Sequence, residues 1–157
     1  MLSITISAGQ MSDIEELNAM MFELHDEHHL ACPEFFKTAH DIEQEKSISR
    51  YLDDPECLVF VAKVENNIVG FITGHFSELV SSVSKPVQMG SIDELYVRKA
   101  YRHQHIANQL CSTLHQRFKE YGVAQIFVEV WEFNSSAQKF YQQLGFDHHI
   151  HWLRKSI

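Results

Sequence analysis

The hydrophobic period of this chain changes at residues 53–55 (DDP), and no other feature restricts its fold as strongly. Before this point, apolar residues recur at the spacing of amphipathic helices, which predicts helices over about 13–29 and 41–52. After it, residues 58–64 (LVFVAKV) and 68–76 (IVGFITGHF) have the composition of two strands joined by a short Asn-Asn turn. The chain is therefore expected to combine helices with an antiparallel hairpin.

The rest of the chain predicts a β-α-β unit after the hairpin. The remaining expected elements are strands at 3–7, 88–97, 126–130 and 146–153 and helices at 106–121 and 135–144. A hairpin followed by a β-α-β unit indicates an α/β fold with a mixed sheet and helices packed on its faces. No repeat or linker interrupts the pattern, and the length of 157 residues fits one domain over 1–157.

The charge balance limits the classes of partner. Lys and Arg number 13 against 21 Asp and Glu, so the formal net charge is −8 when the eleven histidines are neutral. Nucleic acids and anionic lipids bind through clusters of Lys and Arg, so we expect neither nucleic-acid nor membrane binding. A cationic ligand is favoured instead.

The cysteines and the N-terminal sequence predict a reducing, cytoplasmic location. Cys32, Cys57 and Cys111 are an odd number at wide spacing, without a C-x-x-C pair. The first residues lack a basic segment followed by an apolar one, and no apolar run is long enough to span a membrane.

A strand, a basic loop and a helix start follow one another over residues 92–107 (IDELYVRKAYRHQHIA). The first amides of a helix have no intrahelical acceptor and carry partial positive charge, so they bind phosphates well. Lys99 and Arg102 add positive charge at this point. The stretch predicts an anion site, although a solvated basic turn would give the same pattern.

A second stretch joins Asn134 to Tyr141 across two turns of one predicted helix. Asn134 is suited to cap that helix, and the phenol of Tyr141 could reach a site above the end of strand 126–130. A tyrosine packed on the apolar face of its helix is the alternative interpretation.

Together, the two stretches resemble the GNAT superfamily of N-acetyltransferases. The family's acyl-CoA signature is Arg or Gln, two residues, Gly, one residue, then Gly or Ala; here residues 102–107 give RHQHIA. The family's later pattern appears as Asn134, Ala137, Tyr141, Gly145 and Phe146. The resemblance implies a mostly antiparallel central sheet of six to seven strands, flanked by four helices and splayed between the fourth and fifth strands.

The resemblance also implies acetyl-CoA as acyl donor, CoA as product, and a set of contacts to them. The implied cofactor-binding residues are Leu95, Tyr96, Val97, Arg102, His103, Gln104, His105, Ile106, Ala107, Asn134 and Tyr141. The strand residues would bind the pantetheine arm through backbone groups, and the loop would bind the diphosphate. His105 replaces the first glycine of the signature, so its side chain must point outward or add a hydrogen bond of its own.

An amine acceptor must lose a proton before it attacks a thioester, because an amine like that of lysine has a pKa of about 10.4. The family's pattern corresponds to Asp93, Glu94 is an equal candidate that would act directly or through a water chain, and Glu129 is a third. Neighbouring strand residues point to opposite faces, so only one of Asp93 and Glu94 is expected to face the acceptor. Each could also be a solvated acid. Tyr141 is expected to donate a hydrogen bond to the leaving thiolate.

The acceptor loop of the family corresponds here to residues 25–34 (HDEHHLACPE), where Asp26, Glu27 and Glu34 would suit a cationic amine. A small cationic amine or polyamine is the favoured acceptor, and a peptide amine comes next.

The competing hypotheses are a noncatalytic acyl-CoA-binding module and a metal-responsive protein. The histidine clusters at 25–29 and 148–151 suggest the latter, although they lack a recognised ligand order, so no metal is predicted. The C-terminal residues 151–157 (HWLRKSI) would suit a homodimer contact or a sheet edge.

Overall fold

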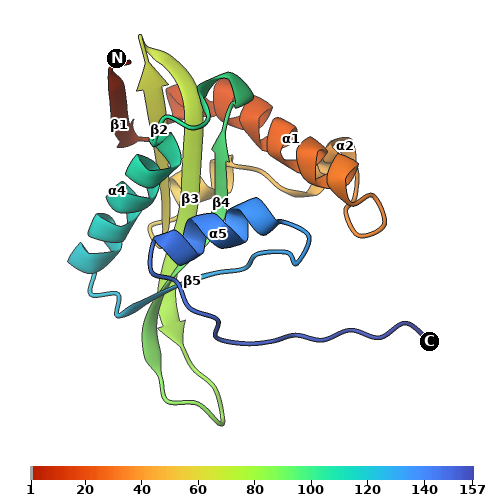
Figure 1. The fold of residues 1–157 in the computed structure, drawn as a ribbon. Helices are drawn as coiled ribbons and strands as arrows, with labels where there is room; N and C mark the ends of the chain where they lie inside the picture. Colours follow the sequence, from red (N-terminus) through yellow and green to blue (C-terminus); the bar gives the residue numbers. More distant parts are fainter. Residues whose placement is uncertain (1) are drawn as a thin grey trace.

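The computed structural model describes residues 2–157, so Met1 of the expected domain lies outside the described residues. One sheet contains five strands in the order β1-β2-β3-β4-β5 (Figure 1). The strands are β1 (Ile4–Ala8), β2 (Cys57–Val64), β3 (Asn67–Leu79), β4 (Val87–Val97) and β5 (Gln125–Val128). The first three pairs are antiparallel, and β4 and β5 are parallel.

The prediction of six to seven strands is wrong, since residues 146–153 form no strand. Trp152 and Leu153 in this segment are exposed, and the C-terminal segment runs away from the sheet in Figure 1. A strand is stable only when a neighbouring edge satisfies its backbone groups and one face is buried, and within residues 2–157 this segment has neither.

The helices differ from the sequence prediction in one place. They are α1 (Ile14–Ala31), α2 (Ala39–Glu45), α3 (Ser49–Asp53), α4 (Ile106–Glu120) and α5 (Ser135–Gln143), with 3₁₀ turns η1 (Met11–Asp13) and η2 (Lys99–Tyr101). The helix expected over 41–52 is divided into α2 and the single turn α3, so four longer helices flank the sheet. The division occurs because Lys46 is extended (φ −125°, ψ 125°), while Ile48 is buried in the core.

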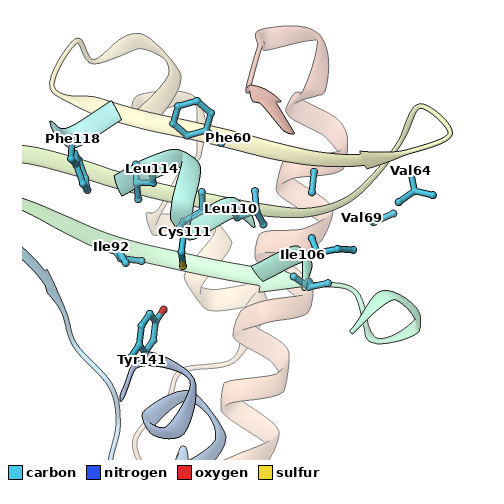
Figure 2. Close-up of a cluster of buried hydrophobic side chains, with 13 residues drawn as sticks. Phe60, Val64, Val69, Ile92, Ile106, Leu110, Cys111, Leu114, Phe118 and Tyr141 are labelled. Atoms are coloured by element: carbon cyan, nitrogen blue, oxygen red, sulfur yellow. The ribbon is translucent and has the colours of Figure 1, made fainter. Parts of the chain in front are cut away.

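The two faces of the sheet carry separate hydrophobic cores. On one face, α4 and Tyr141 of α5 pack against Ile72 and Ile92 (Figure 2). On the other face, α1 packs against Phe71 and Tyr96. Figure 1 shows α1 and α4 on opposite sides of the strands. No helix within residues 2–157 has the length and apolar character needed to cross a bilayer.

β4 and β5 separate after a short paired stretch. Their pairing runs from Met89 opposite Gln125 to Ile92 opposite Val128, whereas β4 continues to Val97. The second half of β4 thus has no strand partner on this side. This separation of the fourth and fifth strands is the one that the family resemblance implied, and it leaves β4 backbone groups without a strand partner on this side.

Candidate functional site

A β-bulge lies where β4 leaves β5. Thr73 of β3 is paired with Glu94 and Gly74 with Ile92, so Asp93 is an extra residue in β4. Two residues of a bulged strand lie opposite one residue of its neighbour, which reorients their side chains. Asp93 contacts His75 and Glu94 contacts Thr73, and these β3 residues share one face because they are two positions apart. Both carboxylates therefore project to the α1 side, the side of Phe71 and Tyr96, and the expectation that these neighbours point to opposite faces is wrong.

Glu94 is buried and both of its carboxylate oxygens have partners. The hydroxyl of Thr73 donates to Oε2, and the ammonium of Lys46 pairs with Oε1. The backbone N–H of Glu94 in turn donates to Thr73 Oγ1 at 3.0 Å. Glu94 is only 4% exposed, so the Lys46 charge is the counterion that offsets much of its cost of burial.

Asp93 receives a different set of hydrogen bonds. The hydroxyls of Tyr51 and Ser91 donate to it at 3.0 Å and 2.8 Å, and His75 Nδ1 lies 2.7 Å from Oδ2. Burial, followed by the charges of Glu94 and Asp93, raises the pKa of Tyr51 well above its ordinary value. Tyr51 therefore remains a donor, and Asp93 is held in place by three side chains.

The loop before α4 presents a row of unpaired amides. His103 and His105 adopt left-handed φ angles of 63° and 62°. Within residues 2–157, the amides of residues 103–108 donate no hydrogen bond, and no side chain caps α4. His105 is exposed, so its side chain points outward and leaves the backbone accessible. Such a run of amides at a helix start fits a phosphate group.

The side chain of Arg102 points away from this row of amides. Its Nε donates to the Val97 carbonyl at 2.7 Å, and its Nη2 lies 2.9 Å and 3.0 Å from the two oxygens of Glu27. The guanidinium also lies 5.4 Å from the ring centroid of Tyr96. Arg102 thus connects the loop to α1, and its guanidinium is occupied by protein groups.

The remaining implied cofactor contacts lie in two places. Leu95, Tyr96 and Val97 form the end of β4 that is paired with β3 but not with β5, and the Tyr96 hydroxyl donates to Glu23 at 3.0 Å. Gln104, Ile106 and Ala107 belong to the loop and the first turn of α4, where Ile106 is buried.

Asn134 and Tyr141 anchor the start and the core-facing side of α5. Asn134 Oδ1 accepts from the backbone N–H of Ala137 at 3.1 Å, so it caps the helix as predicted. Figure 2 shows Tyr141 projecting from α5 toward Ile92 and Cys111. Tyr141 is buried, and this burial, followed by the charge of a Cys111 thiolate, raises the pKa of Tyr141 above its ordinary value. Its hydroxyl remains a hydrogen-bond donor at neutral pH.

The acidic residues proposed for the acceptor side occupy different environments. Glu27 is paired with Arg102, Asp26 is half-buried on α1, and Glu34 is exposed in the loop after it. Glu129, the third base candidate, is exposed directly after β5. Among these residues, Glu27 is already used in an ion pair.

An aromatic cluster, defined here as Phe35, Phe36, Trp131 and Phe133, joins the α1–α2 loop to the β5–α5 loop. The ring centroid of Phe36 lies 4.6 Å from that of Trp131 and 5.9 Å from that of Phe133. The guanidinium of Arg154 lies 3.9 Å from the Phe35 centroid, so this cluster already binds a cation.

Sequence reasoning missed the aromatic cluster and the partners of the two carboxylates, Lys46, Thr73, His75 and Tyr51. The four partners come from two stretches, residues 46–51 and β3, which only the pairing of β3 with β4 and the break after α2 bring to the carboxylates. The histidines of α1 pack locally: His29 Nδ1 lies 2.8 Å from the Phe36 carbonyl oxygen. Within residues 2–157, no three His, Cys, Asp or Glu side chains are arranged to hold a metal ion.

Comparison with known proteins agrees with this geometry. The model of the acetyltransferase (GNAT) family matches residues 21–146. An acetyltransferase from Vibrio fischeri is 52% identical, with a TM-score of 0.68, over 81% of this chain and 96% of that chain. An uncharacterised N-acetyltransferase of Lactobacillus delbrueckii subsp. lactis is 23% identical over 99 residues, and the match spans 61% of this chain and 57% of the length of that relative.

The fold is also similar to that of an aminoglycoside N-acetyltransferase, AAC(6')-Iy, solved with a bisubstrate analogue that joins CoA to monomethyl-acetylneamine. The two chains are 16% identical, with a TM-score of 0.71 over 99% of this chain and 99% of that chain. At this identity the comparison concerns the fold.

Proposed function

This chain belongs to the acetyltransferase (GNAT) family of acetyl-CoA-dependent acyltransferases, and we propose that it acetylates a small cationic amine by direct transfer. The observation that carries the proposal is the bulge in β4, which turns Asp93 and Glu94 to one side beside the separation from β5. The acceptor would therefore meet two carboxylates at the position where the strands part.

The residues that would hold acetyl-CoA fit its chemistry. The unpaired amides of residues 103–108 suit the diphosphate. The edge of β4 at Leu95, Tyr96 and Val97 that β5 does not cover suits the amide groups of the pantetheine arm, with the Val97 carbonyl already bound by Arg102. Asn134 lies at the start of α5 on the far side of the separation. Acetyl-CoA supplies an activated acyl group, and the chain's task is to position it against a neutral amine.

We assign the base role to Glu94. Its Oε1 already faces an ammonium group, that of Lys46, and an acceptor ammonium entering the same position would take over that contact. Glu94 would then receive the proton that makes the acceptor nucleophilic. Asp93, with three partners of its own, would act as a positioning residue by fixing His75 and Tyr51.

Tyr141 would complete the transfer as a donor to the departing sulfur. A hydroxyl with a raised pKa does not lose its proton at neutral pH, so it stabilises a thiolate by hydrogen bonding. Tyr141 projects toward Ile92, where β4 and β5 part, which supports this role.

The charge and the aromatic faces of the acceptor side support a cationic amine over a peptide. The net charge is −8, Glu34 lies in the loop that carries Phe35 and Phe36, and Asp26 lies on α1, which precedes this loop. Aromatic faces attract ammonium groups, as Arg154 on Phe35 illustrates. Polyamines are the first class to test, aminoglycosides the second because of the structural neighbour, and peptide amines the third.

A thiol-release assay with acetyl-CoA and a panel of these three classes tests the proposal. We expect CoA release that depends on the amine and is fastest with a polyamine or other small cation. Release with peptide amines alone would overturn the acceptor assignment. Tight acetyl-CoA binding without turnover on any amine would overturn the catalytic assignment itself.

Glu94→Gln and Asp93→Asn form a matched pair for the base assignment. General-base catalysis contributes about 10²–10⁴-fold, so Glu94→Gln should lower kcat by about a hundredfold or more, and Asp93→Asn should lower it less. Glu129→Gln serves as the third member of the set and is expected to retain activity. A larger loss for Asp93→Asn than for Glu94→Gln would reverse the two roles.

We further propose that the chain acts as one domain in the cytoplasm and forms a homodimer through residues 151–157. Trp152 is 95% exposed, and a neighbouring copy would bury this ring together with Leu153. Light scattering should give a dimer for the full chain and a monomer for Trp152→Asp. A monomeric full chain would contradict the proposal.

A further inference from the structure

Lys46 occupies the place where the proposed reaction needs an acceptor amine. It lies in the connection between α2 and α3, in the extended conformation that interrupts the helix expected over 41–52. From there its ammonium pairs with Oε1 of Glu94, on a strand 48 residues further along the chain. The chain thus presents a primary amine to its own candidate base.

The burial of the carboxylate sets this pair apart from the other lysine ion pairs within residues 2–157, since the Asp13 side chain that pairs with Lys63 is 11% exposed. Lys37 also pairs with a glutamate, Glu45, at 2.8 Å, but their side chains are 58% and 68% exposed. In the Lys46–Glu94 pair the lysine side chain is 39% exposed and the carboxylate 3%. The Glu94 carboxylate is thus almost entirely removed from solvent, and Lys46 and Thr73 are its side-chain partners.

We propose that Lys46 is a self-acetylation site, and this inference rests on the proposed function. The Lys46 ammonium transfers one proton to Glu94, and its Nζ forms a bond to the carbonyl carbon of the acetyl group. The carbon–sulfur bond breaks, and CoA leaves with the electron pair and takes up the second proton that Nζ loses, while Glu94 later returns its proton to solvent. The products are N-acetyl-Lys46 and CoA, so one acetyl group is transferred for each CoA released.

Acetylation would change the site as well as the lysine. N-acetyl-Lys46 carries no charge, so Glu94 loses its counterion while Thr73 still donates to Oε2. The vacated contact then favours the ammonium of a free acceptor, because an unpaired buried carboxylate is costly. Self-acetylation would therefore prime the chain for cationic acceptors.

The test is incubation of the full chain with acetyl-CoA and no acceptor, followed by intact-mass and peptide mass spectrometry. We expect the addition of one acetyl group on Lys46, which blocks trypsin there and leaves residues 38–50 as one peptide. The rate should be independent of protein concentration, as for an intramolecular step. Lys46 should react at least about tenfold faster than Lys37, because it is positioned beside a base.

A chemical acetylating reagent, the N-hydroxysuccinimide ester of acetate, supplies a second readout that needs no catalysis. This reagent follows exposure, so it should modify Lys37 before Lys46 and reverse the order obtained with acetyl-CoA. Lys46→Arg keeps the charge and should abolish the acetyl-CoA-dependent addition, whereas Lys119→Arg, an exposed control on α4, should not.

Three outcomes would overturn the proposal. The first is acetylation by acetyl-CoA of several exposed lysines, in the same order in which the chemical reagent modifies them. The second is a rate of acetylation that rises with protein concentration. The third is an unmodified Lys46 in a chain that acetylates a polyamine. The last outcome leaves the proposed function intact, whereas the absence of CoA release with every amine and with Lys46 would overturn both.

Discussion

The Nη2 atom of Arg102 lies 2.9 Å from Oε1 and 3.0 Å from Oε2 of Glu27, which connects the loop before α4 to α1. The Nε atom of the same guanidinium donates to the Val97 carbonyl at the end of β4. A single side chain therefore holds together three elements that surround the proposed diphosphate site. This role is structural and does not require contact with the ligand.

We predict that Arg102 and Glu27 are energetically coupled. A double-mutant cycle of Arg102→Ala and Glu27→Ala, followed by urea denaturation, should give a coupling energy of about 1 kcal/mol, because both groups are half-buried and make two short contacts. Glu34→Ala, an exposed acid in the loop after α1, is the control and should show no coupling. A coupling near zero would mean that the loop is held by other contacts.

The second prediction concerns the left-handed backbone at His105. Its φ of 62° is costly for any residue with a Cβ, so His105→Gly should be more stable than His105→Ala by about 1 kcal/mol. Equilibrium denaturation of the two variants measures this difference. Acetyl-CoA should bind His105→Gly at least as tightly as the parent chain, since the proposed contacts are backbone amides. Equal stability of the Gly and Ala variants would contradict the left-handed assignment.

Local sequence patterns predicted the elements that local interactions stabilise. The hairpin of β2 and β3 and the Asn134 cap of α5 follow from short-range rules of turns and helix ends, although the hairpin turn is Glu65-Asn66 and not the expected Asn66-Asn67. The segment 146–153 has a strand-like composition but lacks a partner edge within residues 2–157, which its own sequence does not reveal. Local pattern fails there because strand formation depends on a distant partner.

The bulge could not be predicted from the sequence for the same reason. Nothing in the dipeptide Asp93-Glu94 indicates an extra residue, because the bulge is a property of the register between β3 and β4. The partners of Glu94 come from β3 and from the break between α2 and α3. The two acids could be identified as candidates, whereas their common side and their counterions needed the tertiary structure.

The third prediction is that Tyr141→Phe lowers kcat more than it changes KM. The ring packs edge-on against Phe140 and Phe146, at centroid distances of 5.1 Å and 5.4 Å, and phenylalanine keeps these contacts. Stability should thus change little, and the loss of one donor to the leaving sulfur should cost about ten- to a hundredfold in kcat. Steady-state kinetics with the best amine, together with thermal denaturation, separates the two effects. An unchanged kcat would remove Tyr141 from the reaction.

The last prediction links the pH dependence of stability to His25 on α1. Burial, then the charges of Lys46 and His28, lowers the pKa of His25 from 6.5 to about 4, and its Nε2 is buried without a partner in residues 2–157. Between these pH values the unfolded chain binds more protons than the folded chain, so the free energy of unfolding should rise from pH 4 to pH 6.5. His25→Leu should flatten this rise in urea denaturation at a series of pH values.

Lys46→Gln removes one of the charges that lower the pKa of His25, so the His25 ring should titrate at higher pH in an NMR titration of that variant. If the pKa of His25 is the same in the Lys46→Gln variant, the Lys46 ammonium does not lie beside Glu94 and α1.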